Sequence, residues 1–197
     1  MKKLQKIYIR NLIKLFSIKN IPNCLTFLRI ILIPCIIILL EIGTKKYDWL
    51  ALFFYVFACF SDFLDGYLAR KFEIESNFGK FFDPIADKIL VVSVIFIMVV
   101  QDKIQGILIY PALIIILREI LVSGLRDFFS YKKENLIVTN LSKWKTLIQM
   151  TSLGFLIVQH NFETKFIYYC GFLGLSLASV LTIYTGYLYF KKNIKLF

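Results

Sequence analysis

The sequence is poor in the residues that support cysteine-based or histidine-based chemistry. It holds only four cysteines and one histidine in 197 residues. The cysteines show no spacing typical of a metal site, and they fall in or beside apolar segments: Cys24, Cys35, Cys59 and Cys170. We interpret them as reduced packing residues and His160 as incidental. The chemistry of this chain must therefore be sought in other residue types.

Charged residues are also scarce. They make up 19% of the chain, whereas 58% is hydrophobic, and the mean hydropathy is +0.71. This composition is too apolar for a soluble domain, so we expect a single membrane domain over residues 1–197. The formal net charge is +11. Cytoplasmic loops and anionic lipid headgroups explain that excess more readily than nucleic acid does, so no nucleic-acid partner is expected.

The first twenty residues lack the uninterrupted apolar stretch of a signal peptide. Lys6, Arg10 and Lys14 interrupt it, and no small-residue cleavage site follows. These charges recur every four residues, while Leu4 and Leu12 lie away from them. The pattern predicts a basic amphipathic helix over residues 1–20 that lies in the membrane interface. A frayed basic tail is the alternative.

Six apolar segments follow, with no long linker, repeat or low-complexity tract between them. Most are close to the roughly 20 residues that a membrane-spanning helix needs. The predicted spans are residues 25–42, 49–68, 81–100, 107–129, 144–158 and 166–190, and the fifth is short. The fold class is therefore all-α and integral to the membrane, with a six-helix core over residues 25–190.

The distribution of lysine and arginine predicts the orientation of these spans. The N-terminal segment, the second and fourth connections and the C-terminal tail are rich in both residues. The opposite connections hold only Lys45, Lys46, Lys103 and Lys165. Because cytoplasmic loops carry the excess of positive charge, both termini are expected to face the cytoplasm. The protein is accordingly expected to be a multi-pass protein of the cell membrane.

One stretch, from Asp62 to Asp87, concentrates polar residues within this apolar sequence. At 100° per residue, one helix face carries Asp62, Asp65, Gly66, Ala69 and Arg70, and another carries Gly79, Asp83 and Asp87. Two facing helices would bring four carboxylates together, which requires cations near lipid. Oxygen-only ligands favour Mg²⁺ or Mn²⁺ over zinc. The alternative is a set of carboxylates at helix ends in a solvated loop.

Pro84 leaves two ways to build the second of these helices. Asp83 and Pro84 can be the N-cap and the first helical residue. Alternatively, the helix starts before Gly79 and Pro84 bends it. We favour the second arrangement because it keeps Gly79, Asp83 and Asp87 on one face.

The pattern D-x2-D-G-x2-A-R-x8-G-x3-D-x3-D fills every fixed position of a known signature. It resembles that of the CDP-alcohol phosphatidyltransferase family, which transfers a phosphatidyl group from a CDP-linked lipid to an alcohol and releases CMP. The resemblance implies that Asp62, Asp65 and Asp83 bind metal and that Asp87 is the general base and also touches metal. It further implies two ions, and CDP-lipid binding by Asp62, Gly66, Ala69, Arg70 and Gly79.

Further segments resemble one branch of this family, the bacterial phosphatidylglycerophosphate synthases. They are Ile21–Arg29, Asp83–Lys88, Arg118–Arg126 and a G-K-x-K-T box at Ser142–Thr146, where Ser142 replaces the usual glycine. This branch uses glycerol 3-phosphate as acceptor and CDP-diacylglycerol as donor. Members of the family are often homodimers, so a homodimer is expected by resemblance.

The positive residues of these segments suit an acceptor that carries a phosphate. Arg118 and Glu119 lie inside an apolar segment, where charges are costly and usually functional. The predicted phosphate-binding residues are Arg118, Arg126, Lys143 and Lys145. Two alternatives remain: cytoplasmic-loop charges without a binding role, and a structural ion pair between Arg118 and Glu119.

The sequence therefore predicts a membrane enzyme that makes phosphatidylglycerol phosphate. The nearest alternative is a family member with another acceptor, of the cardiolipin, inositol-phosphate or serine type. Intramembrane prenyltransferases also use Asp-rich helices with Mg²⁺, but their motifs lack the Asp-Gly-x2-Ala-Arg element. A cation transporter would use the carboxylates as an ion path, and it would leave the small residues beside Arg70 unexplained.

Overall fold

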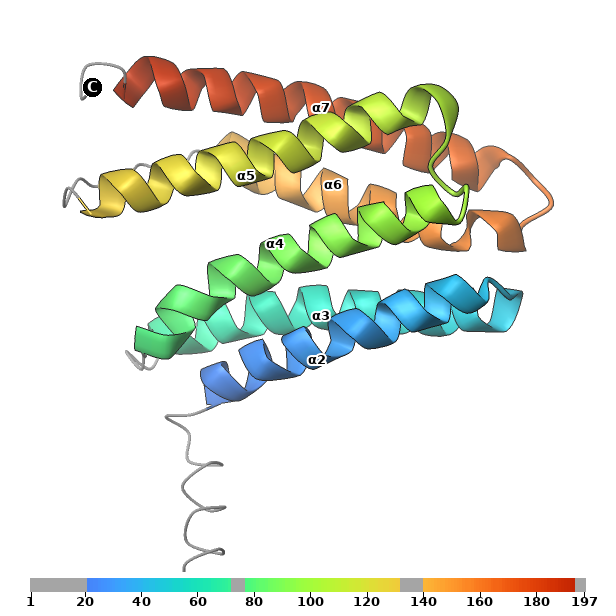
Figure 1. The fold of residues 1–197 in the computed structure, drawn as a ribbon, viewed down its shortest axis with the longest axis horizontal. Coiled ribbons are helices and arrows are strands. Elements are labelled where there is room, and N and C mark those ends of the chain that lie inside the picture. The colour runs from blue at the N-terminus through green and yellow to red at the C-terminus, as the bar shows by residue number, and fades with distance from the viewer. Residues whose placement is uncertain (1–20, 72–76, 132–139, 194–197) are drawn as a thin grey trace, which may run out of the picture.

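The computed structural model describes residues 21–71, 77–131 and 140–193, and in these residues it is helical without a strand (Figure 1). The long helices are α2 (Ile21–Ile42), α3 (Lys45–Lys71), α4 (Asn77–Val100), α5 (Ile109–Tyr131), α6 (Asn140–Val158) and α7 (Phe166–Asn193). Two short 3-10 helices, η2 (Gly106–Leu108) and η3 (Gln159–Asn161), precede α5 and follow α6. The interfacial helix predicted over residues 1–20 lies outside the described residues.

Each predicted apolar segment falls on one long helix, with the fourth beginning in η2. The fifth segment is longer than predicted, because α6 begins at Asn140. Within the described residues, three stretches are long and apolar enough to cross a membrane: Cys24–Ile42, Gly106–Leu125 and Phe166–Leu188. The helical membrane architecture is therefore confirmed, and the count of six spans stays a prediction.

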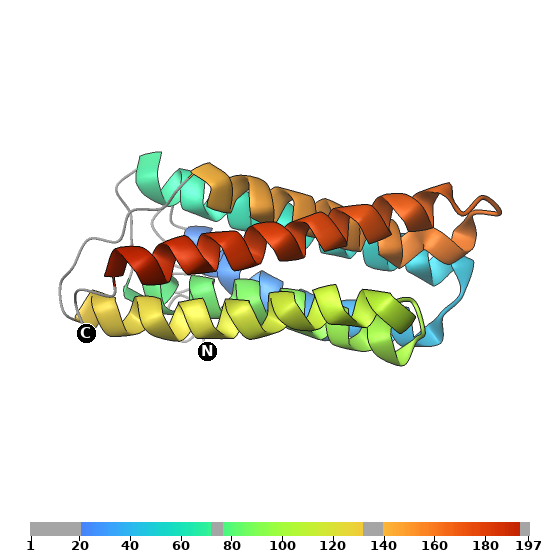
Figure 2. The same ribbon diagram turned by 90° about the horizontal axis from the view of Figure 1, so that it is seen from above.

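The six helices pack side by side in a closed ring (Figures 1 and 2). Around the ring, the contacts run from α2 to α3, α6, α7, α5 and α4, and then back to α2. Consecutive helices are antiparallel. The starts of α2, α4 and α6 therefore lie at the same end of the bundle as the ends of α3, α5 and α7 (Figure 1). The two motif helices, α3 and α4, bring their polar halves to this end.

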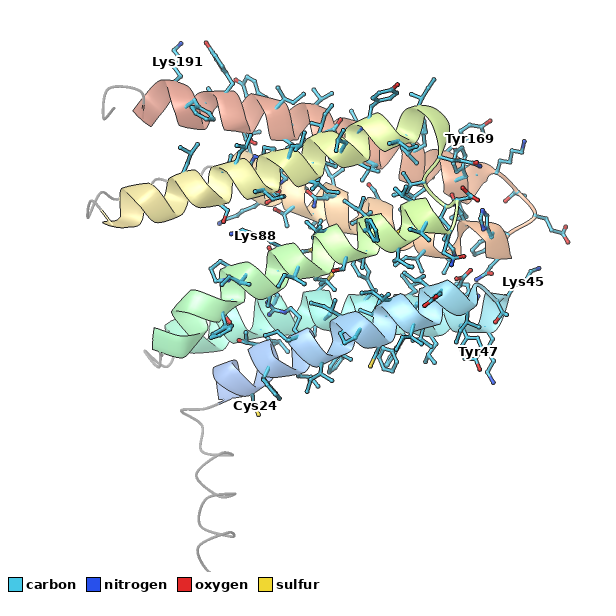
Figure 3. All side chains as sticks on the ribbon, viewed as in Figure 1. Cys24, Lys45, Tyr47, Lys88, Tyr169 and Lys191 are labelled. Carbon is cyan, nitrogen blue, oxygen red and sulfur yellow. The ribbon has the colours of Figure 1, made fainter. Side chains whose placement is uncertain are left out.

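Apolar side chains cover both the inside and the outside of the bundle (Figure 3). The interior holds fully buried residues such as Ile36, Met98 and Leu153. Large apolar residues such as Phe96 and Val180 point outward and are 68% and 62% exposed. An exterior of this kind is suited to lipid rather than to water, because lipid carries no penalty for contact with apolar surface.

Pro84 lies inside α4, which begins at Asn77, two residues before Gly79. The predicted helix start before Gly79 is therefore confirmed, the N-cap alternative is wrong, and the bend at Pro84 stays a prediction. A helix that is continuous through Pro84 keeps Asp83 and Asp87 one turn apart on the same face. This continuity sets the direction in which both carboxylates leave α4.

Small residues allow α6 and α7 to pack closely, as is common between membrane helices. A Cβ atom at Gly171 would lie 2.6 Å from Leu156 Cδ2, and one at Gly174 would overlap the Ser152 side chain. The two glycines lie three residues apart on α7, so they share a face toward α6. This packing brings α7 close to α6 at the level of the two glycines.

A buried ion pair closes the opposite end of the bundle. Lys103 Nζ lies 2.6 Å from Asp48 Oδ1 and donates a hydrogen bond to the Ile157 carbonyl at 2.7 Å. The Gln159 side chain donates to the Lys103 carbonyl at 2.7 Å. Burial lowers the pKa of Lys103, and the nearby Asp48 opposes that change. These contacts join α3, the α4–α5 connection and α6.

All four cysteines are free thiols. The interpretation of them as packing residues holds for Cys59, which packs against the core. It is wrong for Cys24 and Cys35, which are exposed on α2, because that helix turns one face outward from the bundle. His160 is exposed in η3, at the end of the bundle opposite the starts of α2, α4 and α6 (Figure 1).

Candidate active site

Carboxylates of α3 and α4 meet at the end of the bundle where both motif helices carry their polar residues. Asp62 of α3 interacts electrostatically with Asp83 of α4 and also with Asp87. Like charges repel, so other groups must hold these side chains in place. Five further predicted site residues belong to α3 or α4 by their backbone, but their side chains lie outside the described part: Asp65, Gly66, Ala69, Arg70 and Gly79.

Helix α2 supplies partners for two of the aspartates. Arg29 Nη1 lies 2.8 Å from Asp62 Oδ1, and the Thr26 hydroxyl donates a hydrogen bond to Asp83 Oδ1. Arg29 and Thr26 are both fully buried. The sequence analysis placed these residues in a segment of resemblance but gave them no role. The sequence did contain a signal for a role of Arg29, because a charged residue inside an apolar span is usually functional.

Asp87 has a different environment. Its Oδ1 atom is buried and has no hydrogen-bond partner. A buried carboxylate oxygen without a partner lowers the stability of the fold unless a proton or a cation binds it. Asp87 also interacts electrostatically with Glu119 and Lys145. It therefore stands between the aspartate cluster and a second group of charges on α5 and α6.

The atoms available as metal ligands at this site are of the type that a hard divalent cation prefers. They are carboxylate oxygens, and one of them, Asp87 Oδ1, is buried and unsatisfied. Among the residues that the structure describes, no three Asp, Glu, His or Cys side chains are grouped to hold a metal ion. Asp65, one of the four predicted ligands, is outside that set. The Mg²⁺ or Mn²⁺ site therefore stays a prediction.

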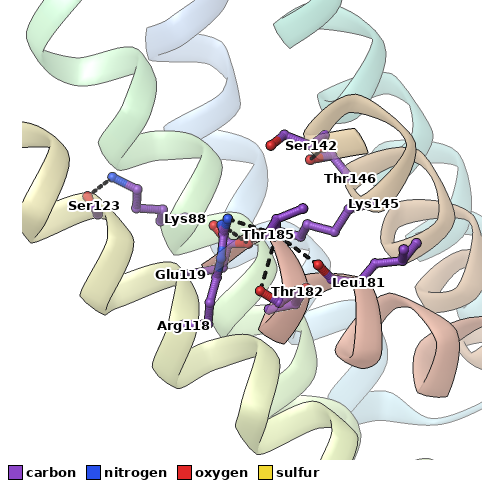
Figure 4. Close-up of polar contacts among 10 residues, drawn as sticks. All are labelled: Lys88, Arg118, Glu119, Ser123, Ser142, Lys145, Thr146, Leu181, Thr182 and Thr185. Carbon is purple, nitrogen blue, oxygen red and sulfur yellow. Dashed lines mark hydrogen bonds and ion pairs between the residues drawn. The ribbon is translucent and has the colours of Figure 1, made fainter. Parts of the chain in front are cut away.

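The second group centres on Glu119 (Figure 4). Lys145 Nζ of α6 contacts Glu119 Oε1, and Arg118 Nη1 lies 3.6 Å from the same oxygen. Arg118 Nη2 donates a hydrogen bond to Thr185 Oγ1 of α7 at 3.2 Å. One carboxylate thus holds two cations from two helices, and a threonine of a third helix orients the arginine. We call Arg118, Glu119, Lys145 and Thr185 the cation cluster.

Of the other two predicted phosphate-binding residues, only Lys143 has a described side chain. Lys143 is exposed near the start of α6, and the Arg126 side chain lies outside the described residues. Ser142, which replaces a glycine of the resembled motif, sits within α6, where its carbonyl accepts a hydrogen bond from Thr146 Oγ1 at 3.1 Å. Serine at this position is therefore compatible with a regular helix start.

Sequence reasoning missed two contacts that shape the site. Thr185 of α7 was not singled out, because the last segment matched only in hydropathy, and no local signal marked it. Lys88, which follows Asp87, contacts the Ser123 hydroxyl of α5 through its Nζ atom (Figure 4). The contacts join residues that lie 35 and 67 positions apart on different helices, so they depend on the assembled ring.

Comparison with known proteins gives the chain its relatives. It is 44% identical over 176 residues to the CDP-diacylglycerol–glycerol-3-phosphate 3-phosphatidyltransferase of Rickettsia typhi, covering 88% of this chain and 96% of that protein. The Rickettsia felis protein of the same name is 43% identical, with coverages of 91% and 98%. The Escherichia coli K12 protein of that name is 32% identical, with coverages of 84% and 90%.

The family match covers most of the described helices. The CDP-alcohol phosphatidyltransferase family matches residues 19–185, a range that contains the aspartates of α3 and α4, their partners on α2 and the whole cation cluster. This match and the near full-length similarity to the relatives confirm the resemblance that the aspartate pattern indicated. The chain belongs to the CDP-alcohol phosphatidyltransferase family.

Proposed function

We propose that this chain transfers the phosphatidyl group of CDP-diacylglycerol to sn-glycerol 3-phosphate, giving phosphatidylglycerol phosphate and CMP in phospholipid biosynthesis. The single observation that carries this proposal is the similarity, over nearly the whole chain, to relatives named for that reaction. The charges support it. Carboxylates and cations lie in adjacent clusters, as needed for a donor with a diphosphate and an acceptor with a phosphate.

The donor would bind at the aspartates. In this proposal Asp62, Asp65, Asp83 and Asp87 hold Mg²⁺ or Mn²⁺, with two ions bound. When bound, the ions neutralise the diphosphate and polarise the phosphorus under attack. Gly66, Ala69 and Gly79 lack bulk and leave space for the cytidine and its phosphates beside the helix backbone, while Arg70 pairs with a phosphate.

Asp87 is the residue that would accept the proton. Its buried Oδ1 atom has no hydrogen-bond partner, so it is free to receive the hydrogen of the acceptor hydroxyl. The acceptor oxygen then forms a bond to the phosphorus of the lipid, and the bond from that phosphorus to the CMP oxygen breaks. The proton stays on Asp87, and CMP leaves with the electron pair.

The acceptor phosphate would bind at the cation cluster. Arg118 offers a planar donor set that suits phosphate, and Lys145 lies close enough to Asp87 for their charges to interact. An acceptor held by these two cations would have its hydroxyl directed toward Asp87. Arg126 and Lys143 are proposed to add positive charge at the rim. Serine carries no phosphate and would leave these cations unused, whereas inositol phosphate would also bind them, so an acceptor panel must separate it from glycerol 3-phosphate.

An apolar groove between α3 and α6 is proposed to receive an acyl chain of the donor. It has a volume of about 480 Å³, and its lining includes Cys59, Val56, Leu52, Gly154 and Phe155. Cys59 precedes Asp62 by one helical turn, and the lining continues along α3 to Trp49. That distance is about 15 Å at 1.5 Å per residue, which is about the hydrocarbon depth of one leaflet.

The placement in the cell remains part of the proposal. The apolar segment lengths support six spans, and the spacing of basic residues supports an interfacial helix over residues 1–20. The lysine and arginine distribution supports termini and an active site that face the cytoplasm. CDP-lipid and glycerol 3-phosphate would then reach the site from the cytoplasmic side. A homodimer is proposed from the family resemblance alone.

An acceptor panel tests this function. Purified protein in detergent is given CDP-diacylglycerol and Mg²⁺ or Mn²⁺, and CMP release is measured with glycerol 3-phosphate, phosphatidylglycerol, serine and inositol phosphate added one at a time. We expect release with glycerol 3-phosphate and little with the others. Preference for another alcohol would place the chain in a different branch of the family. A prenyltransferase or a cation transporter would release no CMP with any acceptor.

A further inference from the structure

We infer that Arg29 and Thr26 of α2 are positioning residues for the metal-binding aspartates: each holds one carboxylate, of a different helix, in the place from which it binds the ion. The inference rests on the metal site of the proposed function and assigns a role to a helix outside the aspartate motif. Neither residue is proposed to touch substrate.

Burial separates Arg29 from the substrates. Its side chain has 0% exposure, whereas the side chain of its partner Asp62 is 39% exposed. The guanidinium therefore lies behind the carboxylate, with Asp62 between it and the open side of the site. A buried arginine in an apolar helix is stable only with a well-placed anion, and the 2.8 Å contact supplies one.

Thr26 repeats this arrangement one helical turn earlier. It is fully buried and donates its hydroxyl hydrogen to Asp83 Oδ1. Residues three apart share one face of a helix, so a single face of α2 provides a donor for Asp62 of α3 and a donor for Asp83 of α4. Helix α2 packs against both of these helices. It is therefore placed to fix the spacing between the two carboxylates.

Fixed spacing has a physical reason at this site. The charges of Asp62 and Asp83 repel each other, and side chains without partners would turn apart. An ion that demands near-ideal octahedral geometry, such as Mg²⁺, binds weakly when its ligands must first be reoriented. Partners behind metal ligands commonly contribute 10- to 100-fold in metal affinity. We expect α2 to make a contribution of this size.

Mn²⁺ binding without any lipid substrate tests this role. Free Mn²⁺ is measured by electron paramagnetic resonance while it is titrated into purified full-length protein in detergent. Thr26→Val keeps the shape of the side chain and removes the hydrogen bond, and we expect Mn²⁺ affinity to fall about 10-fold. Thr26→Ser restores the hydroxyl and should restore affinity. Arg29→Gln should lower affinity about 10- to 100-fold, with Arg29→Lys intermediate.

The matched control is Thr182→Val on α7. Thr182 is equally buried, but its hydroxyl has no hydrogen-bond partner, so this variant should bind Mn²⁺ like the wild type. Unchanged or tighter Mn²⁺ binding by folded Thr26→Val would overturn the positioning role, whatever the Arg29 variants do. If the wild type bound no Mn²⁺, the metal site and this inference would both fail. CMP release by the same preparation then reports separately on the transfer reaction.

Discussion

Replacing Arg118 by alanine tests how the acceptor is recognised. The Arg118 side chain is 16% exposed and lies between Glu119 and Thr185. A hydrogen bond from such a group to a charged partner contributes about 1.5–3 kcal/mol. Since about 1.4 kcal/mol corresponds to a tenfold change, the KM for glycerol 3-phosphate should rise roughly 10- to 150-fold. The KM for CDP-diacylglycerol should stay within about twofold, because the donor binds at the aspartates.

The assay is CMP release measured against each substrate in turn, with the other at saturation. Thr185→Val provides the graded control, because it keeps the cation and removes the 3.2 Å hydrogen bond that orients it, together with the bonds of the same hydroxyl to carbonyls within α7. This bond holds Arg118 in place and does not contact the acceptor, so we expect a smaller rise in the same KM, roughly 2- to 10-fold, as for a loss of about 0.5–1.5 kcal/mol.

Two results would refute this reasoning. Equal rises in both KM values would show that Arg118 supports the whole site and has no preference for the acceptor. A normal acceptor KM in folded Arg118→Ala would return the residue to the alternative of the sequence analysis, a structural ion pair with Glu119.

Three other substitutions probe separate parts of the molecule. Asp87→Asn removes the proton acceptor, so CMP release should fall to background while thermal unfolding in detergent is unchanged. Lys103→Met leaves the buried Asp48 carboxylate without its partner and should lower the free energy of unfolding by about 3–5 kcal/mol, seen as a lower thermal midpoint. Gly154→Phe fills the groove between α3 and α6, because even a Cβ atom added at this glycine would lie 3.4 Å from Leu52 Cδ1. This variant should raise the KM for CDP-diacylglycerol only.

Each of these has a matched comparison. Asp102→Asn removes an exposed carboxylate at the far end of the bundle, at a positive φ of 54° that asparagine tolerates, and should leave activity intact. The double variant Lys103→Met with Asp48→Leu should recover most of the lost stability. Near-normal turnover by Asp87→Asn, full stability of Lys103→Met alone, or a raised acceptor KM in Gly154→Phe would contradict the respective assignments.

The sequence was sufficient to predict the helices and the face of α4 that carries Asp83 and Asp87. Apolar length placed each helix, because a span must hold its own backbone hydrogen bonds in lipid. Periodicity placed Asp83 and Asp87 on one face, and Pro84 did not break that face since α4 continues through it. Local rules of this kind need no knowledge of which helices become neighbours.

Contacts between helices could not be predicted in the same way. The sequence analysis counted Lys103 as a loop charge, yet it is 2% exposed and paired with Asp48 across the bundle. It likewise grouped Lys145 with other cations, whereas the structure gives it Glu119 as a direct partner. Both pairings join parts of the chain that are not neighbours in the ring, and nothing in the spacing along the chain specifies such contacts.

The most direct measurement of the proposed reaction follows an isotope label from the acceptor into the lipid product. Purified protein is incubated with CDP-diacylglycerol, a divalent cation and carbon-13-labelled glycerol 3-phosphate, and both CMP and labelled lipid are quantified by mass spectrometry. Phosphatidyl transfer predicts equal amounts of CMP and labelled phosphatidylglycerol phosphate, and neither from Asp87→Asn. CMP with phosphatidic acid and no labelled lipid would mean that water is the acceptor, and that result would contradict the proposed reaction.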